Sequence, residues 1–217
     1  MEKKTDLKTL SNKAKIQYIW DYYRWYIIGG ICVVAALISL IHHFATYKES
    51  IMDIVMVNVN DPYQENTGLD EFYELAGLDP ANDEILIDSS LVYSLVETDS
   101  TNYYNEQALM VKLAAGETDL FFAPEQVFQT YADWGYLLDL STVLTTEELD
   151  KYSDILVYGT DEETNSTFPC GVILENNDWL VENNYYSDTC YFGIMVNSKA
   201  PELALEFFHY IMENSGY

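Results

Sequence analysis

The chain has 217 residues, of which 36 are acidic and 10 are basic, and its formal net charge at pH 7 is −26. Residues 1–24 have a net charge of +3, whereas the rest of the chain contains 4 basic and 33 acidic side chains. A surface this acidic lacks the cationic footprint that phosphate-backbone binding requires, which excludes nucleic acid as the main partner.

Residues 25–47 carry no formal charge, and the run at 26–41 is almost wholly apolar. A hydrocarbon core about 30 Å thick needs roughly 20 helical residues, so the segment predicts a transmembrane helix at about 25–45. Aromatic side chains, which favour the membrane–water boundary, gather at its amino end: Trp20, Tyr22, Tyr23, Trp25 and Tyr26. A buried core helix or a cleaved signal peptide is the alternative interpretation.

Charge asymmetry predicts the orientation. Basic flanks stay inside, so residues 1–24 are expected to be a cytoplasmic leader and 46–217 an extracytoplasmic domain of a single-pass cell-membrane protein. Cleavage is not expected, because the leader is long and no small-x-small site follows the apolar segment. Cys32 precedes most of that segment, so we also expect it to carry no lipid.

The remaining sequence alternates between strand and helix patterns. They predict, in chain order, a strand at 52–59, a helix at 69–76, a strand at 84–88, a helix at about 103–115, a strand at 119–123, a helix beginning at Pro124, strands at 170–175 and 190–197, and a helix from about 198–201 to Asn214. Thr145 and Glu148 have the spacing of a capping box, and a polar loop is expected at 159–167. This alternation predicts a three-layer α/β domain with parallel strands.

Cys170 and Cys190 are the only cysteines beyond the apolar segment. We expect free thiols, and a disulfide closing a loop of about 20 residues is the alternative. One cysteine pair without clustered histidines makes no zinc signature, so neither a metal nor a cofactor is expected.

Three stretches resemble parts of bacterial extracellular solute-binding proteins, the receptors of ABC importers: LAAGETDLFFAPEQVFQTYADWGYLLDLS, FPCGVILE and YFGIMVNSKAPELALEFFHYIM. In the first, a strand carries an Asp between two helices; in the last, a Ser-Lys pair precedes the closing helix. The leader YIWDYYRWYIIGG is similar to that of single-span proteins of Gram-positive bacteria. The resemblance implies a shortened, membrane-anchored lobe of the periplasmic-binding-protein fold, its second lobe reduced to the stretch near 150–190.

Ligands of open α/β sheets meet the loops at the carboxyl ends of the strands. The candidate ligand-binding residues are therefore the polar residues that follow strands, with two tryptophans as stacking surfaces: Asn60, Asp61, Tyr63, Ser89, Ser90, Glu125, Trp134 and Trp179. Aromatic and acidic side chains together suit a sugar or a cationic solute. The alternative makes Ser89 and Ser90 turn residues, Glu125 a first-turn helix acid and Trp134 a core anchor.

Two functions remain open. One is an extracytoplasmic ligand-binding or sensing domain; the other is a scaffold or adaptor of a cell-envelope complex that keeps the fold without a small-molecule pocket. An adaptor should expose an apolar or aromatic patch of several hundred Å². No catalytic residues are expected, because no nucleophile–base arrangement can be assembled around His209, and adjacent acids such as Glu147 and Glu148 cannot act as separated glycosidase carboxylates.

Overall fold

A computed structural model describes residues 12–46, 48, 50–64, 67–94, 100–160 and 165–215. The chain divides into two compact units, residues 1–48 and residues 49–217.

The first unit contains one long helix, α1 (Asn12–Thr46). Its stretch Trp20–His42 is, by length and composition, the one helical segment of the described residues that could cross a membrane, and none of its apolar window is buried. The helix therefore includes the second half of the basic leader as well as the apolar segment. At the junction between them, the Arg24 guanidinium lies over the Trp25 ring, 5.5 Å from its centroid.

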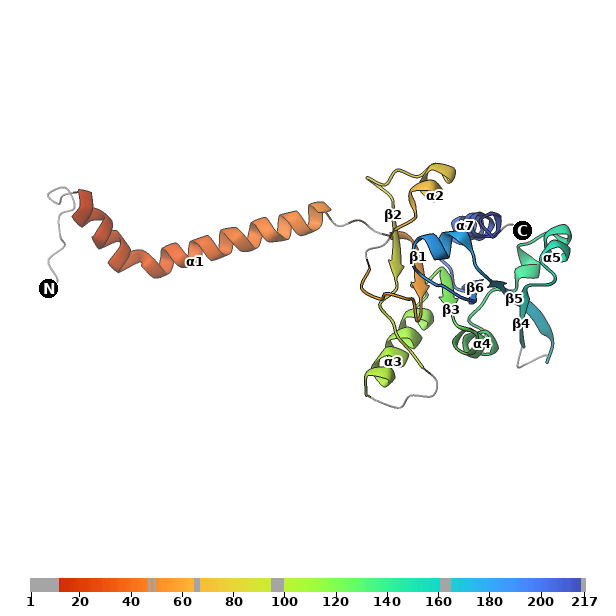
Figure 1. The fold of residues 1–217 in the computed structure, drawn as a ribbon. Helices are drawn as coiled ribbons and strands as arrows, with labels where there is room; N and C mark the ends of the chain where they lie inside the picture. Colours follow the sequence, from red (N-terminus) through yellow and green to blue (C-terminus); the bar gives the residue numbers. More distant parts are fainter. Residues whose placement is uncertain are drawn as a thin grey trace. The chain divides into compact units, whose positions relative to one another are not determined.

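The second unit contains an open six-stranded sheet with the order β2-β1-β3-β6-β5-β4 (Figure 1). The strands are β1 (Ser50–Met56), β2 (Glu84–Asp88), β3 (Leu120–Ala123), β4 (Leu156–Thr160), β5 (Thr167–Leu174) and β6 (Cys190–Ile194). β1 pairs in parallel with β2 and β3, but the pairs β3–β6, β6–β5 and β5–β4 are antiparallel. The prediction of a parallel sheet is thus wrong for three of the five strand pairs. β1, β2 and β3 are joined by connections long enough for parallel pairing, but β6 runs antiparallel to both of its neighbours, β3 and β5.

The residues near 150–190, expected to form a reduced second lobe, belong to the same sheet. β4 and β5 extend it, and the short helix α6 (Asp178–Glu182) leads from β5 toward β6. Neither β4 nor α6 was predicted. The polar stretch at 159–167 obscured β4, because its first two residues end that strand and its last begins β5.

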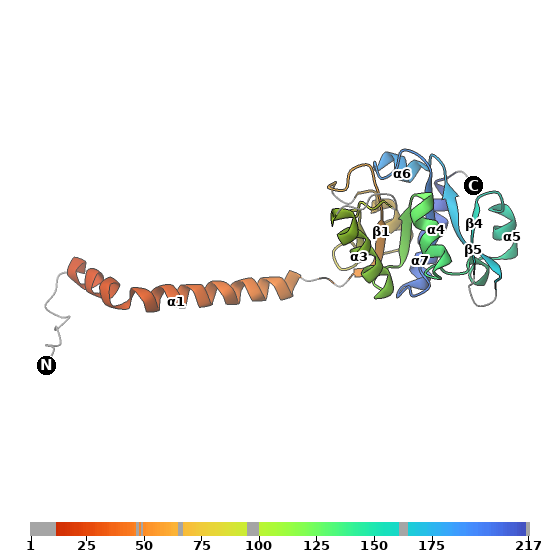
Figure 2. The same cartoon turned by 90° about the horizontal axis from the view of Figure 1, so that it is seen from below.

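Helices cover both faces of the sheet, giving three layers (Figures 1 and 2). One face packs against α2 (Asp70–Leu75), α6, α7 (Pro201–Glu213) and the 3-10 turn η2 (Leu140–Thr142), with the short helix α5 (Thr146–Lys151) beside α7. The other face packs against α3 (Ser100–Ala114) and α4 (Glu125–Asp133).

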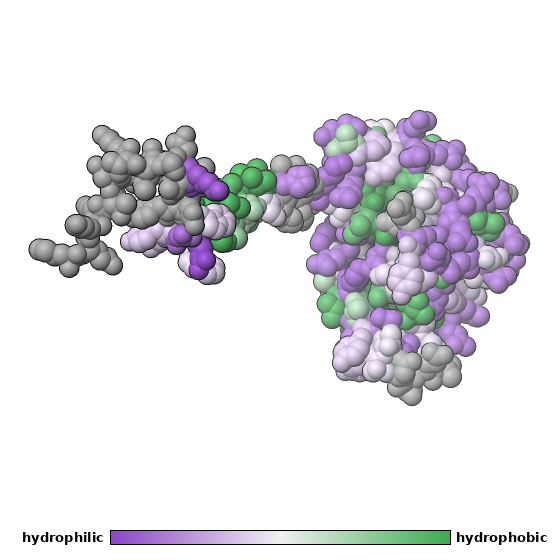
Figure 3. All heavy atoms as spheres, turned by 60° about the vertical axis from the view of Figure 1, so that its left-hand side comes forward, coloured by the Kyte–Doolittle hydropathy of each residue, from purple (hydrophilic) through white to green (hydrophobic). Residues whose placement is uncertain are grey.

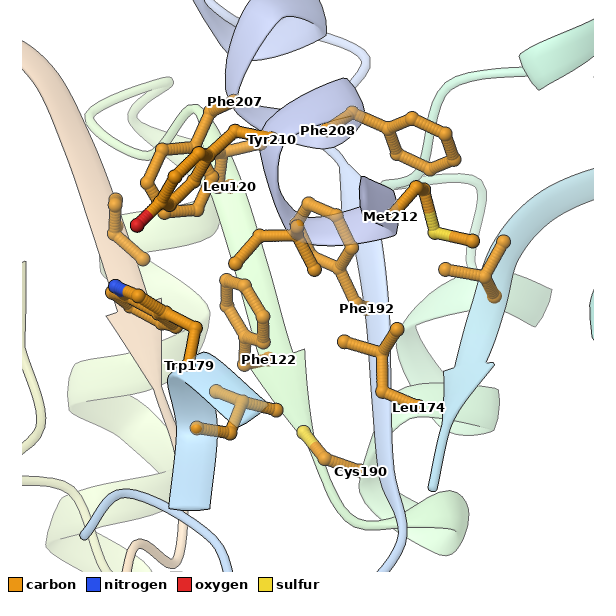
Figure 4. Packing of buried hydrophobic residues seen from close by; sticks show 14 of the residues in the cluster. Leu120, Phe122, Leu174, Trp179, Cys190, Phe192, Phe207, Phe208, Tyr210 and Met212 are labelled. Carbon is orange, nitrogen blue, oxygen red and sulfur yellow. The ribbon is translucent and has the colours of Figure 1, made fainter. Parts of the chain in front are cut away.

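Aromatic rings dominate the α7 side of the core (Figure 4). The rings of Phe122 on β3 and Phe192 on β6 stack with centroids 4.3 Å apart, and Phe208 of α7 stacks on Phe192 at 5.5 Å. Phe207 meets Phe72 of α2 edge to face at 4.8 Å. Each ring removed from water contributes roughly 1.5–3 kcal/mol, so this layer holds much of the stabilising area.

On the opposite face, α4 lies directly against the backbone of two strands. An added Cβ at Gly171 of β5 would lie 2.4 Å from the Phe128 ring, and one at Gly193 of β6 would lie 3.0 Å from it. Phe128 itself is fully buried. Because these two glycines have no side chains, the Phe128 ring of α4 can lie directly against the backbone of β5 and β6.

Two local predictions are confirmed. The Glu148 amide donates to the Thr145 hydroxyl at 3.3 Å while the Thr145 amide donates to the Glu148 carboxylate at 2.7 Å, which is the capping box that opens α5. Pro124 is the N-cap of α4, one residue before the helix begins.

Cys170 and Cys190 are both free and fully buried, as expected. They belong to opposite hydrophobic clusters, Cys170 on the α4 side of the sheet and Cys190 on the α7 side. Burial raises the pKa of the Cys170 thiol to about 12, so this group is unreactive at neutral pH.

Candidate functional site

The carboxyl ends of β1, β2 and β3 meet at one edge of the sheet because these strands are parallel. Asn60 and Asp61 follow β1, Ser89 and Ser90 follow β2, and Glu125 begins α4 just after β3. The structure therefore places five of the candidate residues at the edge where sequence reasoning put them.

Most of these side chains already bond within the domain. The Asn60 amide group donates to the Ser187 hydroxyl at 2.8 Å, and Asp61 accepts from the Tyr63 amide at 3.0 Å in a local turn. The Ser90 hydroxyl donates to Asp88 at 2.6 Å. Tyr63 projects into solvent with 93% of its surface exposed.

Asp88, the last residue of β2, connects this strand to α3. It accepts from Ser90 and from the ammonium group of Lys112. Burial alone would raise the pKa of the Asp88 carboxyl, but the hydrogen bonds from Lys112 and Ser90 outweigh it and lower the pKa. Ser90 and Lys112 thus stabilise a structural carboxylate.

Tyr186 packs at the carboxyl ends of β1 and β3. This buried side chain comes from the segment between α6 and β6, and its hydroxyl donates to the Val57 carbonyl at 2.6 Å and lies 3.2 Å from the Phe122 carbonyl. Burial raises the pKa of its phenol well above the ordinary value. The loop after β1 closes over the same segment, since the Asn60 amide donates to the Tyr185 carbonyl at 2.8 Å. The Val57 and Phe122 carbonyls and the Asn60 amide are therefore already bonded within the protein.

The two tryptophans lie elsewhere. Trp179 is 3% exposed, its indole N–H donates to the Gly68 carbonyl at 2.6 Å, and its ring stacks on Tyr185. Trp134 is 48% exposed at the carboxyl end of α4. Because α4 runs back from the end of β3, this end lies toward the opposite edge of the sheet, where Tyr136 pairs with Val196. The eight candidate residues do not line one site.

At that opposite edge, Asp119 joins two of the stretches that carry the family resemblance. Its buried carboxylate accepts from the Ser198 hydroxyl at 2.6 Å and from the Lys199 and Ala200 amides at 2.7 and 3.0 Å. Its second oxygen accepts from the Asp53 amide at 2.8 Å. Asp119 thus holds the residues that lead into α7, and neither of the two stretches shows this role by itself.

The Asp53 carboxylate next to it is poorly satisfied. Its Oδ1 is buried and has no hydrogen-bond partner within the described part of the chain. Burial, reinforced by the nearby Asp119 charge, raises the pKa of Asp53 against the opposing effects of Ser50, Lys199 and Lys112. An open groove of about 520 Å³ lies beside the start of α7, and its charged residues Lys199, Glu202 and Glu206 are solvent-exposed.

No set of three potential metal ligands from His, Cys, Asp and Glu occurs among the described residues. His209 of α7 lies 2.9 Å from the Glu148 carboxylate of α5, which is a contact between two surface helices. Nothing in this pair provides a nucleophile.

Sequence reasoning did not identify the outer side of α3. Five exposed residues in its middle form an uncharged surface, here called the α3 outer face: Tyr103, Tyr104, Gln107, Ala108 and Val111. Exposed Val92 lies beside α3, because its carbonyl accepts from the Asn105 side chain at 2.7 Å. Figure 3 turns the left-hand side of Figure 1 toward the viewer and shows hydrophobic residues interrupting a mostly hydrophilic domain surface. The signal in the sequence was the helix STNYYNEQALMVKLA, with only two charged residues in so acidic a chain.

Comparisons with protein-family models, with curated proteins and with solved structures found no match.

Proposed function

We propose that the chain is a single-pass membrane protein whose extracytoplasmic α/β domain is a docking module for another protein. The observation that supports the docking role is that Tyr186 packs against the strand ends, whereas the α3 outer face is exposed and uncharged. The domain is non-enzymatic in this proposal, and it uses no cofactor.

The membrane tether is supported by α1. The apolar window between Trp20 and His42 is long enough to span a bilayer and is not buried by other parts of the protein. Residues 1–24 are basic and everything beyond is acidic, which favours a cytoplasmic amino end and an external domain.

In this proposal the domain is a reduced solute-binding lobe without its ligand site. Of the stretches that resemble solute-binding proteins, the first contains β3 and α4, the second β5, and the third β6 and α7. Tyr186 occupies the strand ends at which such a lobe would hold a solute, and Trp179 packs in the core. A sugar or cationic solute is therefore the less favoured partner.

The α3 outer face supports protein docking. Val111 is 65% exposed and Tyr104 is 70% exposed, although both sit on a well-packed helix whose other side is anchored by buried Leu109 and Leu113. Large apolar side chains grouped on one exposed helix face mark protein interaction sites in soluble domains.

The test uses the full-length chain in intact cells, with a photo-crosslinking amino acid at position 111 or, as a matched control, at position 181. Val181 on α6 is 47% exposed and lies outside the α3 outer face. We expect a discrete crosslinked product from position 111, none from position 181, and digestion of that product by protease added outside the cells.

Two results would contradict the proposal. Equal crosslinking from both positions, or from neither, would remove the docking role, and protection of the domain from external protease would remove the orientation. A melting-point increase of the purified protein with individual sugars or cationic solutes would restore the solute-binding hypothesis.

A further inference from the structure

The α3 outer face differs from the surface around it in charge. Its residues recur at helical spacing, with Tyr104, Ala108 and Val111 on one side of the helix. The two charged residues of α3 lie away from it: half-buried Lys112 bonds to Asp88, and half-buried Glu106 interacts with the Tyr93 hydroxyl.

Other helices of the domain present acids to solvent. On α7 the exposed acids are Glu202, Glu206 and Glu213, and α2 and α5 each begin with acidic residues. The residues after position 24 have a net charge of −29. Two copies of so acidic a domain repel each other, and any contact through α7 or α2 would place carboxylates against carboxylates.

The α3 outer face is also self-complementary. Small Ala108 lies between Tyr104 and Val111, so an antiparallel contact of two α3 helices about a two-fold axis near Ala108 brings Tyr104 of one copy toward Val111 of the other. In such an isologous contact the Tyr104–Val111 pair occurs twice by symmetry. A cationic partner would instead be drawn to the acidic helices.

We propose that the occupant of the α3 outer face is a second copy of this chain, giving a two-fold dimer through α3. This inference rests on the docking role proposed for the same face and names its partner.

The first test is sedimentation equilibrium of residues 50–217, which contain every strand of the sheet and both hydrophobic clusters. We expect a monomer–dimer equilibrium whose dissociation constant falls as NaCl rises from 0.1 to 1 M. The range of charge repulsion shrinks from about 10 Å to about 3 Å over that interval, while the apolar contact is kept. A partner held by opposite charges would show the reverse trend.

Val111→Glu should weaken the dimer at least tenfold, because it places two carboxylates in the contact, whereas Val181→Glu adds the same charge on α6 and should leave the constant unchanged. Both side chains are largely exposed, so the melting temperature should change little in either variant. A wild-type domain that stays monomeric at every salt and protein concentration would overturn the dimer, and so would equal effects of the two variants.

The second test uses the full chain in detergent with Cys32→Ser, which leaves only the two buried thiols. Ala108→Cys should then form an intermolecular disulfide under mild oxidation, because a residue beside a two-fold axis meets its own copy. Val181→Cys should not. If position 108 does not bridge but position 111 crosslinks to a different protein in cells, the second copy is the wrong partner and docking stands. If neither occurs, both proposals fail.

Discussion

The two helical layers of the sheet are built differently. The large side chains of α7 are buried against the sheet and its acidic side chains face solvent, so α7 has one apolar side and the sheet covers it. α3 buries only Leu109, Leu113 and the Asn102 side chain, yet it also carries apolar residues on its solvent side. A helix that is apolar on two sides packs against the sheet with one side and leaves the other side for a partner. For this reason α3, and not α7, is the proposed docking surface.

The largest expected change in stability comes from a substitution in the helical layer that contains α7. Phe207→Ala removes a fully buried ring that contacts Phe72, Trp179 and Tyr210. The free energy of unfolding should fall by about 3–5 kcal/mol, because the fixed rings around it cannot close the cavity. Urea unfolding followed by tryptophan fluorescence measures this. A loss below about 1 kcal/mol would show that the layer repacks freely.

A smaller effect is expected beneath α4. Gly171→Ala places a methyl group 2.4 Å from the Phe128 ring and 2.6 Å from the Phe192 carbonyl oxygen. The ring can move but the carbonyl cannot, so we expect a loss of about 1–3 kcal/mol in the same unfolding assay. Gly135→Ala is not a suitable control because Gly135 has a positive φ of 76°. Because the contact with the Phe192 carbonyl remains, Gly171→Ala combined with Phe128→Leu should be no more stable than Gly171→Ala alone.

The smallest expected effect is at Asp53 of β1, which interacts with Lys112 of α3 and with Lys199 just before α7. Its pKa in the folded protein is raised above the ordinary 3.8, mainly by burial. The stability that goes with the protonated form is therefore complete below about pH 3.8 and is lost as the pH rises through the folded pKa. Asp53→Asn keeps the shape without the charge and should stabilise the domain at pH 7 by about 1 kcal/mol, the lower end of the cost of an unsatisfied buried polar group.

The advantage of the Asp53→Asn variant should vanish in acid. Melting temperatures of both proteins at pH 7 and at pH 3.5 measure it, with Asp61→Asn as a control for the removal of one surface charge. A variant that is less stable than the wild type at pH 7 would show that Lys112 and Lys199 hold the Asp53 charge more firmly than burial disfavours it.

Local patterns in the sequence were sufficient for several elements. The capping box of Thr145 and Glu148, the inward-facing residues of α7 and the apolar strands β1, β2 and β3 all follow from interactions within a few residues of one another. β4 was missed because Leu156–Thr160 continues into a polar stretch, and strand direction was wrong for β5 and β6 because pairing depends on residues far apart in the chain.

The sequence by itself determined the apolar segment of α1, the strong acidity of the residues beyond that segment and the placement of Asn60, Ser89 and Glu125 after strands. Only the tertiary structure decided that a strand end near these residues is bonded within the protein, because Tyr186 comes from a segment more than 100 residues away from Val57 and donates to its carbonyl. It also decided that Cys170 and Cys190 lie on opposite sides of the sheet and that α3 has an apolar surface left over. Burial and exposure are properties of long-range packing, so a local pattern can name the residues available for a surface but not which of them the fold leaves outside.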